Sequence, residues 1–279
     1  MTKTALTQLL QDIFSACPGN VIDAQTALTP DLAGMVLFES PLVGFASAAD
    51  PLFESCRDPK VIGPWHKTPD EWLPRAKTVV SLFFPFTEEV KAGQRKAKCD
   101  TAPSWLHGRV EGQNFIAGYM KAVSEALTQA GLPNCVPCID PRFLSTMGGD
   151  SFPGYPSEGH KVYGSNWSER HAAYICGLGT FGLSRGIITK KGMAGRLASV
   201  ILELELEPDQ RPYTGLYDYC IFCGACAKRC PAQAISMEDG KDHVPCGDRL
   251  AWSRVAYAPR YGCGGCQTAV PCESRIPVR

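Results

Sequence analysis

Apolar residues recur at helical spacing in two long stretches of the chain. In residues 3–17 they fall every third or fourth position, and Pro18 follows as a helix stop. Residues 108–130 carry a second stripe of this kind, closed by Gly131. We therefore expect two amphipathic helices, each with one apolar face turned toward a core.

Other stretches follow the pattern of strands. Residues 78–86, TVVSLFFPF, form a continuous run of apolar and β-branched residues and predict a buried strand. Just before it, Thr68, Pro69 and Glu71 form a capping-box pattern. Residues 185–206 predict two strands around a glycine-containing turn, and leucine–glutamate alternation near the end predicts that about half of that surface meets water.

The remaining segments indicate loops and a domain boundary. Residues 146–165 are rich in Gly, Pro and Ser and predict a long loop, followed by a short helix over 166–176. The polar stretch EPDQRP predicts a linker near residue 210. We expect a front domain over 1–210 and a small domain over 211–279.

Composition limits the class of protein. The chain has 279 residues, of which 44% are hydrophobic and 20% charged, and its formal net charge is zero. This balance gives no electrostatic reason to expect nucleic acid or a membrane surface as a partner. The sequence has neither a membrane-length apolar run nor a secretory signal, so we expect a cytoplasmic protein. In that compartment its 14 cysteines are expected to be metal ligands or thiols rather than disulfides.

The cysteine pattern carries the strongest chemical signal. CIFCGACAKRCP, residues 220–231, has the spacing Cys-x2-Cys-x2-Cys-x3-Cys-Pro of bacterial ferredoxins. In two-cluster ferredoxins the first three cysteines hold one cluster and the fourth holds the other. Four further cysteines follow, which makes eight and suits two [4Fe-4S] clusters. The alternative of a zinc site or free thiols fits less well, because structural zinc sites lack this run.

The crossing rule assigns the eight ligands to two sets. The first set consists of Cys220, Cys223, Cys226 and Cys272. The second set consists of Cys230, Cys246, Cys263 and Cys266. The spacing between Cys266 and Cys272 is longer than ferredoxin symmetry predicts, which leaves the role of Cys272 open. Cys135 and Cys138 have redox-pair spacing, but two unpaired thiols in a loop are the simpler interpretation.

The chain resembles the epoxyqueuosine reductase family and, more distantly, the reductive dehalogenases. The resemblance runs over most of the chain from about residue 40. It is firmest in Glu169-Arg170, Gly177-Leu178-Gly179, Gly192, Leu204-Glu205-Leu206 and the eight-cysteine module with its isolated Cys246.

This resemblance implies an α/β (α+β) fold: a nitroreductase-like cobalamin-binding domain followed by a double-cluster, bacterial ferredoxin-like domain. Cobalamin would bind base-off, with its lower base detached, and the clusters would reduce it. Residues around the predicted turn would face the corrin, where small side chains allow close backbone approach. These residues are Ile187, Gly192, Leu197 and Ala198.

Two departures from the family pattern bear on the substrate. Queuosine enzymes carry an aspartate proton donor upstream of the Glu-Arg pair, and counting back from Gly177 puts Tyr163 there. Reductive dehalogenases use a tyrosine donor, so Tyr163 is a candidate catalytic acid; the alternative is a packing aromatic. The chain also leaves no room after Cys272 for the helical-repeat extension of longer queuosine enzymes. With its zero net charge, this argues against a tRNA substrate.

Other polar residues have a functional and a simpler interpretation each. His160 and Lys161 could line a pocket or be solvated. His171 could ligate cobalt, although a base-off family does not require it. Lys190-Lys191 could contact a phosphate of the cobalamin tail or form a solvated turn.

Three functions remain open at this stage. The first is a cobalamin-dependent iron–sulfur reductase of a small molecule, supplied by a low-potential donor such as ferredoxin or flavodoxin. The second is a protein that binds and reduces a corrinoid for another enzyme. The third is an iron–sulfur electron carrier whose front domain holds a different cofactor, such as a flavin.

Overall fold

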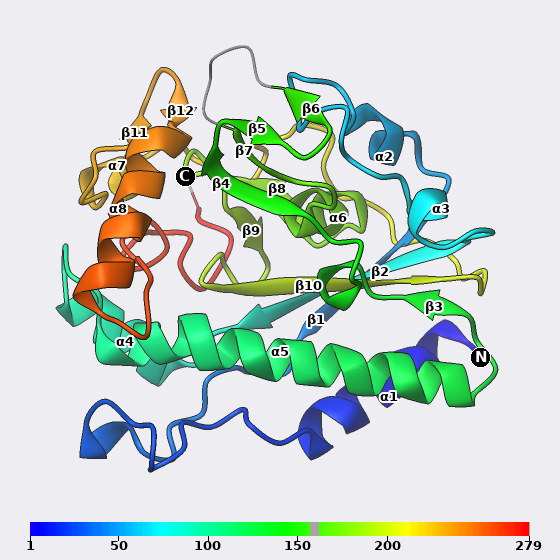
Figure 1. The fold of residues 1–279 in the computed structure, drawn as a ribbon, viewed down its shortest axis with the longest axis horizontal. Coiled ribbons are helices and arrows are strands. Elements are labelled where there is room, and N and C mark those ends of the chain that lie inside the picture. The colour runs from blue at the N-terminus through cyan, green and yellow to red at the C-terminus, as the bar shows by residue number, and fades with distance from the viewer. Residues whose placement is uncertain (157–161, 279) are drawn as a thin grey trace.

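The computed structural model describes residues 1–156 and 162–278 and is built around a four-stranded antiparallel sheet (Figure 1). Its strand order is β1-β2-β10-β3, with β1 Leu42–Ser47, β2 Thr78–Pro85, β3 Asn134–Cys135 and β10 Gly195–Leu202. Every residue of β2 is buried, which confirms the strand predicted from its unbroken apolar run. A capping box precedes it, in which the Thr68 amide donates to Glu71 Oε2 over 2.8 Å.

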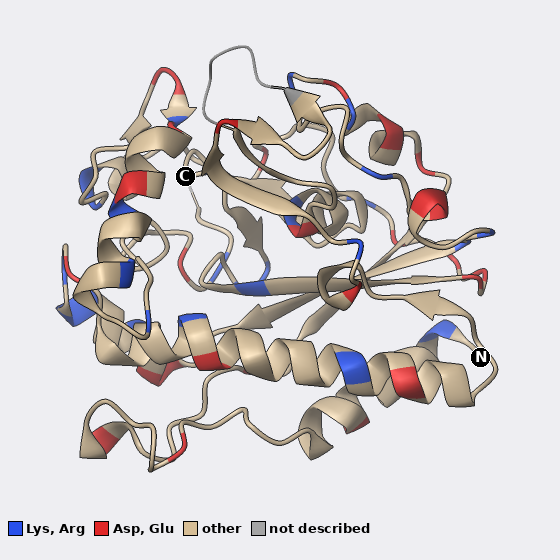
Figure 2. Ribbon diagram, in the orientation of Figure 1, with Lys and Arg blue, Asp and Glu red and all other residues tan. Residues whose placement is uncertain are grey.

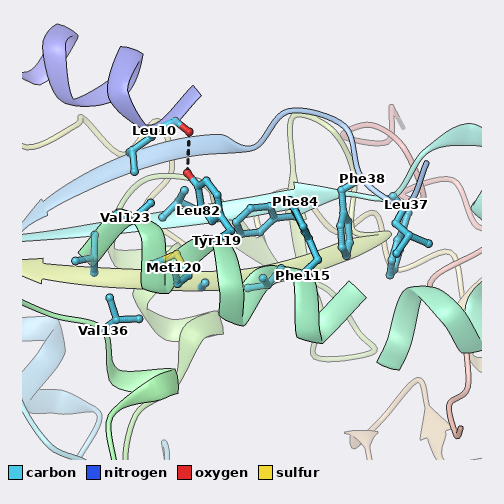
Figure 3. Close-up of a cluster of buried hydrophobic side chains, with 14 of the residues drawn as sticks. Leu10, Leu37, Phe38, Leu82, Phe84, Phe115, Tyr119, Met120, Val123 and Val136 are labelled. Carbon is cyan, nitrogen blue, oxygen red and sulfur yellow. Dashed lines mark hydrogen bonds between the residues drawn. The ribbon is translucent and has the colours of Figure 1, made fainter. Parts of the chain in front are cut away.

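Helices α1 Lys3–Ala16, α4 Glu88–Lys96 and α5 Pro103–Gln129 cover one face of this sheet (Figure 1). Both predicted amphipathic helices are confirmed, but α5 begins at Pro103 rather than near residue 108. Figure 3 shows the core between them, where Phe84, Phe115 and Tyr119 pack together. The Tyr119 hydroxyl donates to the Leu10 carbonyl over 3.0 Å, which satisfies a buried polar group at the α1–α5 contact.

Shorter elements cover the opposite face. They include α2 Pro51–Ser55, α3 Pro69–Trp72 and α6 Glu169–Ile175, the last capped by Ser168. The expected loop over 146–165 is wrong in part. It contains β4 Ser145–Gly149 paired with β7 Val162–Ser165, and β5 Ser151–Phe152 paired with β6 Tyr155–Pro156. These strands are short and rich in small polar residues, so the sequence shows no strand pattern there. The Trp65 ring stacks on Phe152 of β5, with the ring centroids 5.1 Å apart.

The two strands expected in 185–206 exist but do not pair with each other as strands. β9 Ile187–Thr189 pairs with β8 Gly179–Phe181, whereas β10 joins the central sheet. The predicted turn lies between them, and Gly192 adopts a φ of +78° there.

The expected exposure of β10 is also wrong for its final residues. Val200, Ile201 and Leu202 are all buried, because helices pack on both faces of the sheet. The strand ends at Leu202, so the leucine–glutamate alternation that suggested a wet face begins where the strand stops.

The C-terminal part consists of short elements and loops. It contains α7 Ala225–Lys228, β11 Ile235–Ser236 paired with β12 Gly240–Lys241, and α8 His243–Ala256. Short 3-10 turns also occur at Pro30–Leu32 and Pro137–Ile139. The C-terminal residues Cys226, Ile235 and Val270 share one hydrophobic cluster with the β8–β10 region. The molecule is therefore a mixed α/β fold, and the boundary near residue 210 stays a prediction.

None of the helices in the described residues combines the length and apolarity needed to cross a membrane.

Candidate functional site

The first cysteine set surrounds a small enclosed cavity of about 20 Å³. Its four cysteines are Cys220, Cys223, Cys226 and Cys272. Residues from the β8–β9 region, Leu183 and Ile188 among them, form the opposite wall. Cys272 lies beside Met193, with the two sulfur atoms 3.3 Å apart. The structure thus brings Cys272 to the other three members of its predicted set despite the unusual spacing.

The second set lines a larger cavity of about 340 Å³, which we call the second cavity. Its cysteines are Cys230, Cys246, Cys263 and Cys266. Cys230 therefore lines a different cavity from the three cysteines that precede it in the motif, as the crossing rule predicts. The volume falls in the range typical of small-molecule sites.

The thiols of each set line a cavity rather than meet at one point. Within residues 1–156 and 162–278, no three His, Cys, Asp or Glu side chains converge closely enough to hold one metal ion. A four-iron cluster has a volume of its own, so its thiolates stand around a space rather than meet at a point. Burial raises the pKa of the Cys226 thiol to about 11, and a bound cation would reverse that effect.

Tyr163, on β7, also lines the second cavity. Its ring stacks on His243 with a centroid distance of 5.7 Å. A Cβ added at Gly247 would lie 2.6 Å from the Tyr163 hydroxyl, so only glycine leaves room for the ring there. Gly247 follows Cys246, which brings the candidate proton donor close to the second cysteine set.

The lining of the second cavity is strongly basic. Among the described residues it includes no Asp or Glu. Its basic side chains are Arg109, Arg170, Arg196, Lys241 and Arg249. Sequence reasoning missed Arg109 and Arg196, because they lie far apart in the chain and belong to no motif.

The Glu169-Arg170 pair of the family pattern divides between two environments. Arg170 faces the second cavity, where its charge interacts with Cys246 and Cys266. Glu169 points into the protein, and both its carboxyl oxygens are buried beside the side chains of Ser199 and Trp167. Burial raises the pKa of this carboxyl to about 7.

Comparisons with known proteins agree with both parts of this architecture. A family model described as a 4Fe-4S binding domain matches residues 216–236. Tetrachloroethene reductive dehalogenases of Desulfitobacterium hafniense and Dehalobacter restrictus are 46% identical to the chain over 67 residues, which make up 24% of this chain and 12% of theirs. The chain thus spans a small part of the length of these curated relatives.

Solved structures resemble the chain over a much larger part of its length. One epoxyqueuosine reductase aligns with 98% of this chain and 68% of its own, with a TM-score of 0.54 and 16% identity. The epoxyqueuosine reductase from Streptococcus thermophilus aligns with 99% of this chain and 68% of its own, with a TM-score of 0.50 and 17% identity. The chain has the fold of the epoxyqueuosine reductases. A reductive dehalogenase whose dehalogenation is B12-dependent aligns with 85% of this chain and 30% of its own, with a TM-score of 0.50 and 19% identity.

Within this epoxyqueuosine reductase fold, the four residues predicted to face a corrin do not line the second cavity. Ile187 and Leu197 pack in a small apolar cluster beside α6, and Ala198 is fully buried in the main core. A Cβ on Gly192 would lie 2.2 Å from the Glu273 carbonyl oxygen, so packing on the C-terminal segment explains this glycine. Arg196, with its neighbour Gly195, lines the second cavity from β10 instead. Corrin contacts at the four residues stay predictions.

The remaining polar candidates that the structure describes lie outside this site or serve other contacts. His160 and Lys161 fall outside the described residues. His171 Nδ1 lies 2.8 Å from Ser168 Oγ, and burial lowers its pKa to about 4. Lys191 forms an exposed ion pair with Glu39 over 2.9 Å.

Cys135 and Cys138 follow the simpler interpretation. They are free thiols that pack in different hydrophobic clusters. Burial raises the pKa of Cys135 to about 12 and raises that of Cys138 further. Such thiols are poor nucleophiles, which favours the simpler interpretation.

A corrinoid is compatible with the second cavity on the evidence of its walls. The cavity lies directly against the second cysteine set, which would allow electrons to reach a ligand there. Its charged lining residues are all basic, which suits a ligand that carries a phosphate in its tail.

Proposed function

We propose that this chain is a cobalamin-dependent iron–sulfur reductase that acts on a small molecule. One observation carries the proposal: the second cavity is lined both by a complete set of four cysteines and by Tyr163. An electron source and a proton source therefore border the same space, as a reductive reaction requires. The likeness in fold to reductases of two kinds supports the same conclusion.

The two cysteine sets form an electron route through the C-terminal part. Cys223 of the first set is exposed, whereas the second set borders the cavity. The charges of Cys226 and Cys266 interact, so the sets lie close to each other. Two [4Fe-4S] clusters held there would accept electrons one at a time from a low-potential donor such as ferredoxin or flavodoxin and deliver them to the cavity.

The front domain, proposed to span residues 1–210 and to be nitroreductase-like, would hold cobalamin base-off. Reduced cobalamin supplies a strongly nucleophilic cobalt centre. Gly195 and Arg196 on β10 would bind the cofactor in the cavity, next to the second cysteine set. Tyr163 would hold a proton at its hydroxyl for transfer to the substrate.

The nature of the substrate and the location of the protein stay predictions. A formal net charge of zero favours a small molecule over tRNA.

The first experiment is an anaerobic titration of cluster-reconstituted protein with cobalamin, followed by low-temperature EPR during stepwise reduction. We expect a Co(II) signal without nitrogen splitting, which disappears as electrons enter. A spectrum in which only cluster signals appear would contradict cobalamin binding. The chain would then be pursued as an iron–sulfur electron carrier with a different cofactor.

A further inference from the structure

The second cavity has more basic side chains than the charges of the second cysteine set account for. Its five basic side chains come from elements far apart in sequence, and Figure 2 shows basic positions on α5, β10 and α8. None of the five forms an ion pair with an acidic side chain among the residues that the structure describes. Unpaired charge inside a protein is costly, so a ligand of opposite charge is expected nearby.

Arg170 is accounted for by the second cysteine set. Its guanidinium group interacts with the charges of Cys246 and Cys266, which would become thiolates in a cluster. The charges that act on Arg109 and Arg196 are different. They come from other arginines and from Tyr261, and no cysteine contributes. The cysteines thus account for the charge of Arg170 but not for that of Arg109 or Arg196.

Both arginines are oriented by neutral partners. The Tyr261 ring centre lies 4.6 Å from Arg109 Cζ, and Arg254 stacks on the same ring at 4.3 Å. Arg196 donates a hydrogen bond to Gln113 Oε1. Gln113 lies one helical turn after Arg109 on α5, so both guanidinium groups meet at the same part of the cavity wall. Such partners fix the direction of a guanidinium group without neutralising it.

The electrostatics of the pair agree with this geometry. Burial lowers the pKa of Arg196 to about 9, with further lowering by Arg109 and Arg170. Burial also lowers the pKa of Arg109, assisted by Arg254 and Arg170. The pair is thus destabilised in the absence of an anion. Two forked guanidinium groups match the planar or tetrahedral oxygens of a carboxylate or phosphate.

We propose that Arg109 and Arg196 together bind an anionic oxygen group, a phosphate or a carboxylate, on the ligand of the second cavity. The inference rests on the proposed function in one respect, because that function makes the ligand either the cofactor or its substrate. The group is the phosphate of the cobalamin tail in the first case and an acidic group of the substrate in the second. Gln113 and Tyr261 act as positioning residues.

The test is calorimetric titration of cluster-reconstituted protein with inorganic phosphate under anaerobic conditions. We expect Arg109→Gln and Arg196→Gln each to weaken phosphate binding roughly tenfold or more. Arg75→Gln is the matched control, since it removes the same charge from an exposed arginine outside the cavity lining. Iron content and visible absorbance establish that each variant is folded and loaded.

Two results overturn the inference. One is wild-type protein that binds no phosphate at concentrations up to about 10 mM. The other is an equal loss of affinity in Arg75→Gln, which would mean that general charge rather than a defined pair attracts the anion.

Parallel titrations with cobalamin and with cobinamide, which lacks the phosphate and the nucleotide, identify the source of the anionic group. Loss of cobalamin affinity with unchanged cobinamide affinity assigns the pair to the cofactor tail. If the variants bind cobalamin and cobinamide as wild type does, and cobalamin-loaded wild type still binds phosphate, the pair is assigned to the substrate. Phosphate binding that depends on the pair in a protein that binds no corrinoid would sustain the inference while the proposed function fails.

Discussion

At the scale of single residues, buried charge is concentrated around the α6 N-terminus. Glu169 and Arg170 are adjacent, yet one side chain enters the core and the other the second cavity. The sequence identified the pair through its family pattern. It could not tell the two environments apart, since burial of Glu169 depends on packing against β10, some 30 residues later.

Glu169 should make stability depend on pH. Its pKa of about 7 in the folded protein lies above the ordinary value of 4.5, so folding favours the protonated form. The contribution of protonated Glu169 to the free energy of unfolding is full below about pH 4.5. It is lost as the pH rises through 7, which lowers the free energy of unfolding by up to about 3 kcal/mol. We expect the thermal unfolding midpoint of Glu169→Gln to change less between pH 5 and pH 8 than that of wild type.

The control for this experiment is Glu238→Gln, at an exposed position on the β11–β12 turn. It should retain the pH dependence of wild type. Identical pH profiles for Glu169→Gln and wild type would contradict the assignment.

Tyr163→Phe tests the proton donor. Removing the hydroxyl leaves the ring stacked on His243, so cobalamin should still bind and be reduced. Turnover of substrate should fall by at least about 100-fold, the lower range for loss of a general acid. Tyr217→Phe, at an exposed tyrosine outside the second cavity, is the matched control. Full activity of Tyr163→Phe would remove Tyr163 from the reaction.

At the scale of elements, the turn between β9 and β10 joins the front part of the chain to its C-terminal segment. The Met193 amide donates to the Cys272 carbonyl over 2.9 Å, and the Ala194 amide donates to that of Glu273 over 3.1 Å. The sequence predicted the turn from Gly192. It could not predict that β9 pairs with β8 or that the C-terminal segment covers the turn, because hydrophobic alternation does not specify the partner of a strand.

Gly192→Ala should therefore damage the first cluster site in particular. Its new Cβ would meet the Glu273 backbone at 2.2 Å and would displace the segment that carries Cys272. We expect lower thermal stability and loss of up to half the bound iron, measured by calorimetry and iron analysis. Gly131→Ala is the control, since it has a similar φ of +72° but nothing within 4 Å of its added Cβ. It should cost about 1–2 kcal/mol of stability and no iron.

At the scale of the whole molecule, the two cysteine sets and the second cavity differ in how far the sequence could predict them. The first four cysteines of the two sets form a ferredoxin motif in which the fourth binds a different cluster from the first three. Their division between two sets could therefore be proposed from spacing alone. The cavity is assembled from α5, α6, β7, β10 and α8. Arg109 and Arg196 become neighbours only through the packing of α5 on the sheet, which no short stretch of sequence encodes.

The division into two sets is tested by Cys226→Ala and Cys266→Ala. Each variant should lose about half the iron of wild type, and EPR of the reduced protein should show a single, uncoupled cluster that differs between the two variants. Cys99→Ala, at an exposed cysteine outside both cavities, should behave as wild type. Loss of the same signal in both variants would contradict the division.

The contact of Cys272 and Glu273 with the β9–β10 turn also has a consequence for the order in which a cluster at the first set would be assembled. Three thiols of the first set leave the ribosome together, but the fourth, and the segment that closes the site, follow about 45 residues later. Iron delivered before residue 273 has emerged meets an incomplete set of ligands. A cluster at the first set would therefore be completed only after that segment docks on the turn, and until then the nascent chain would carry thiols that are open to oxidation.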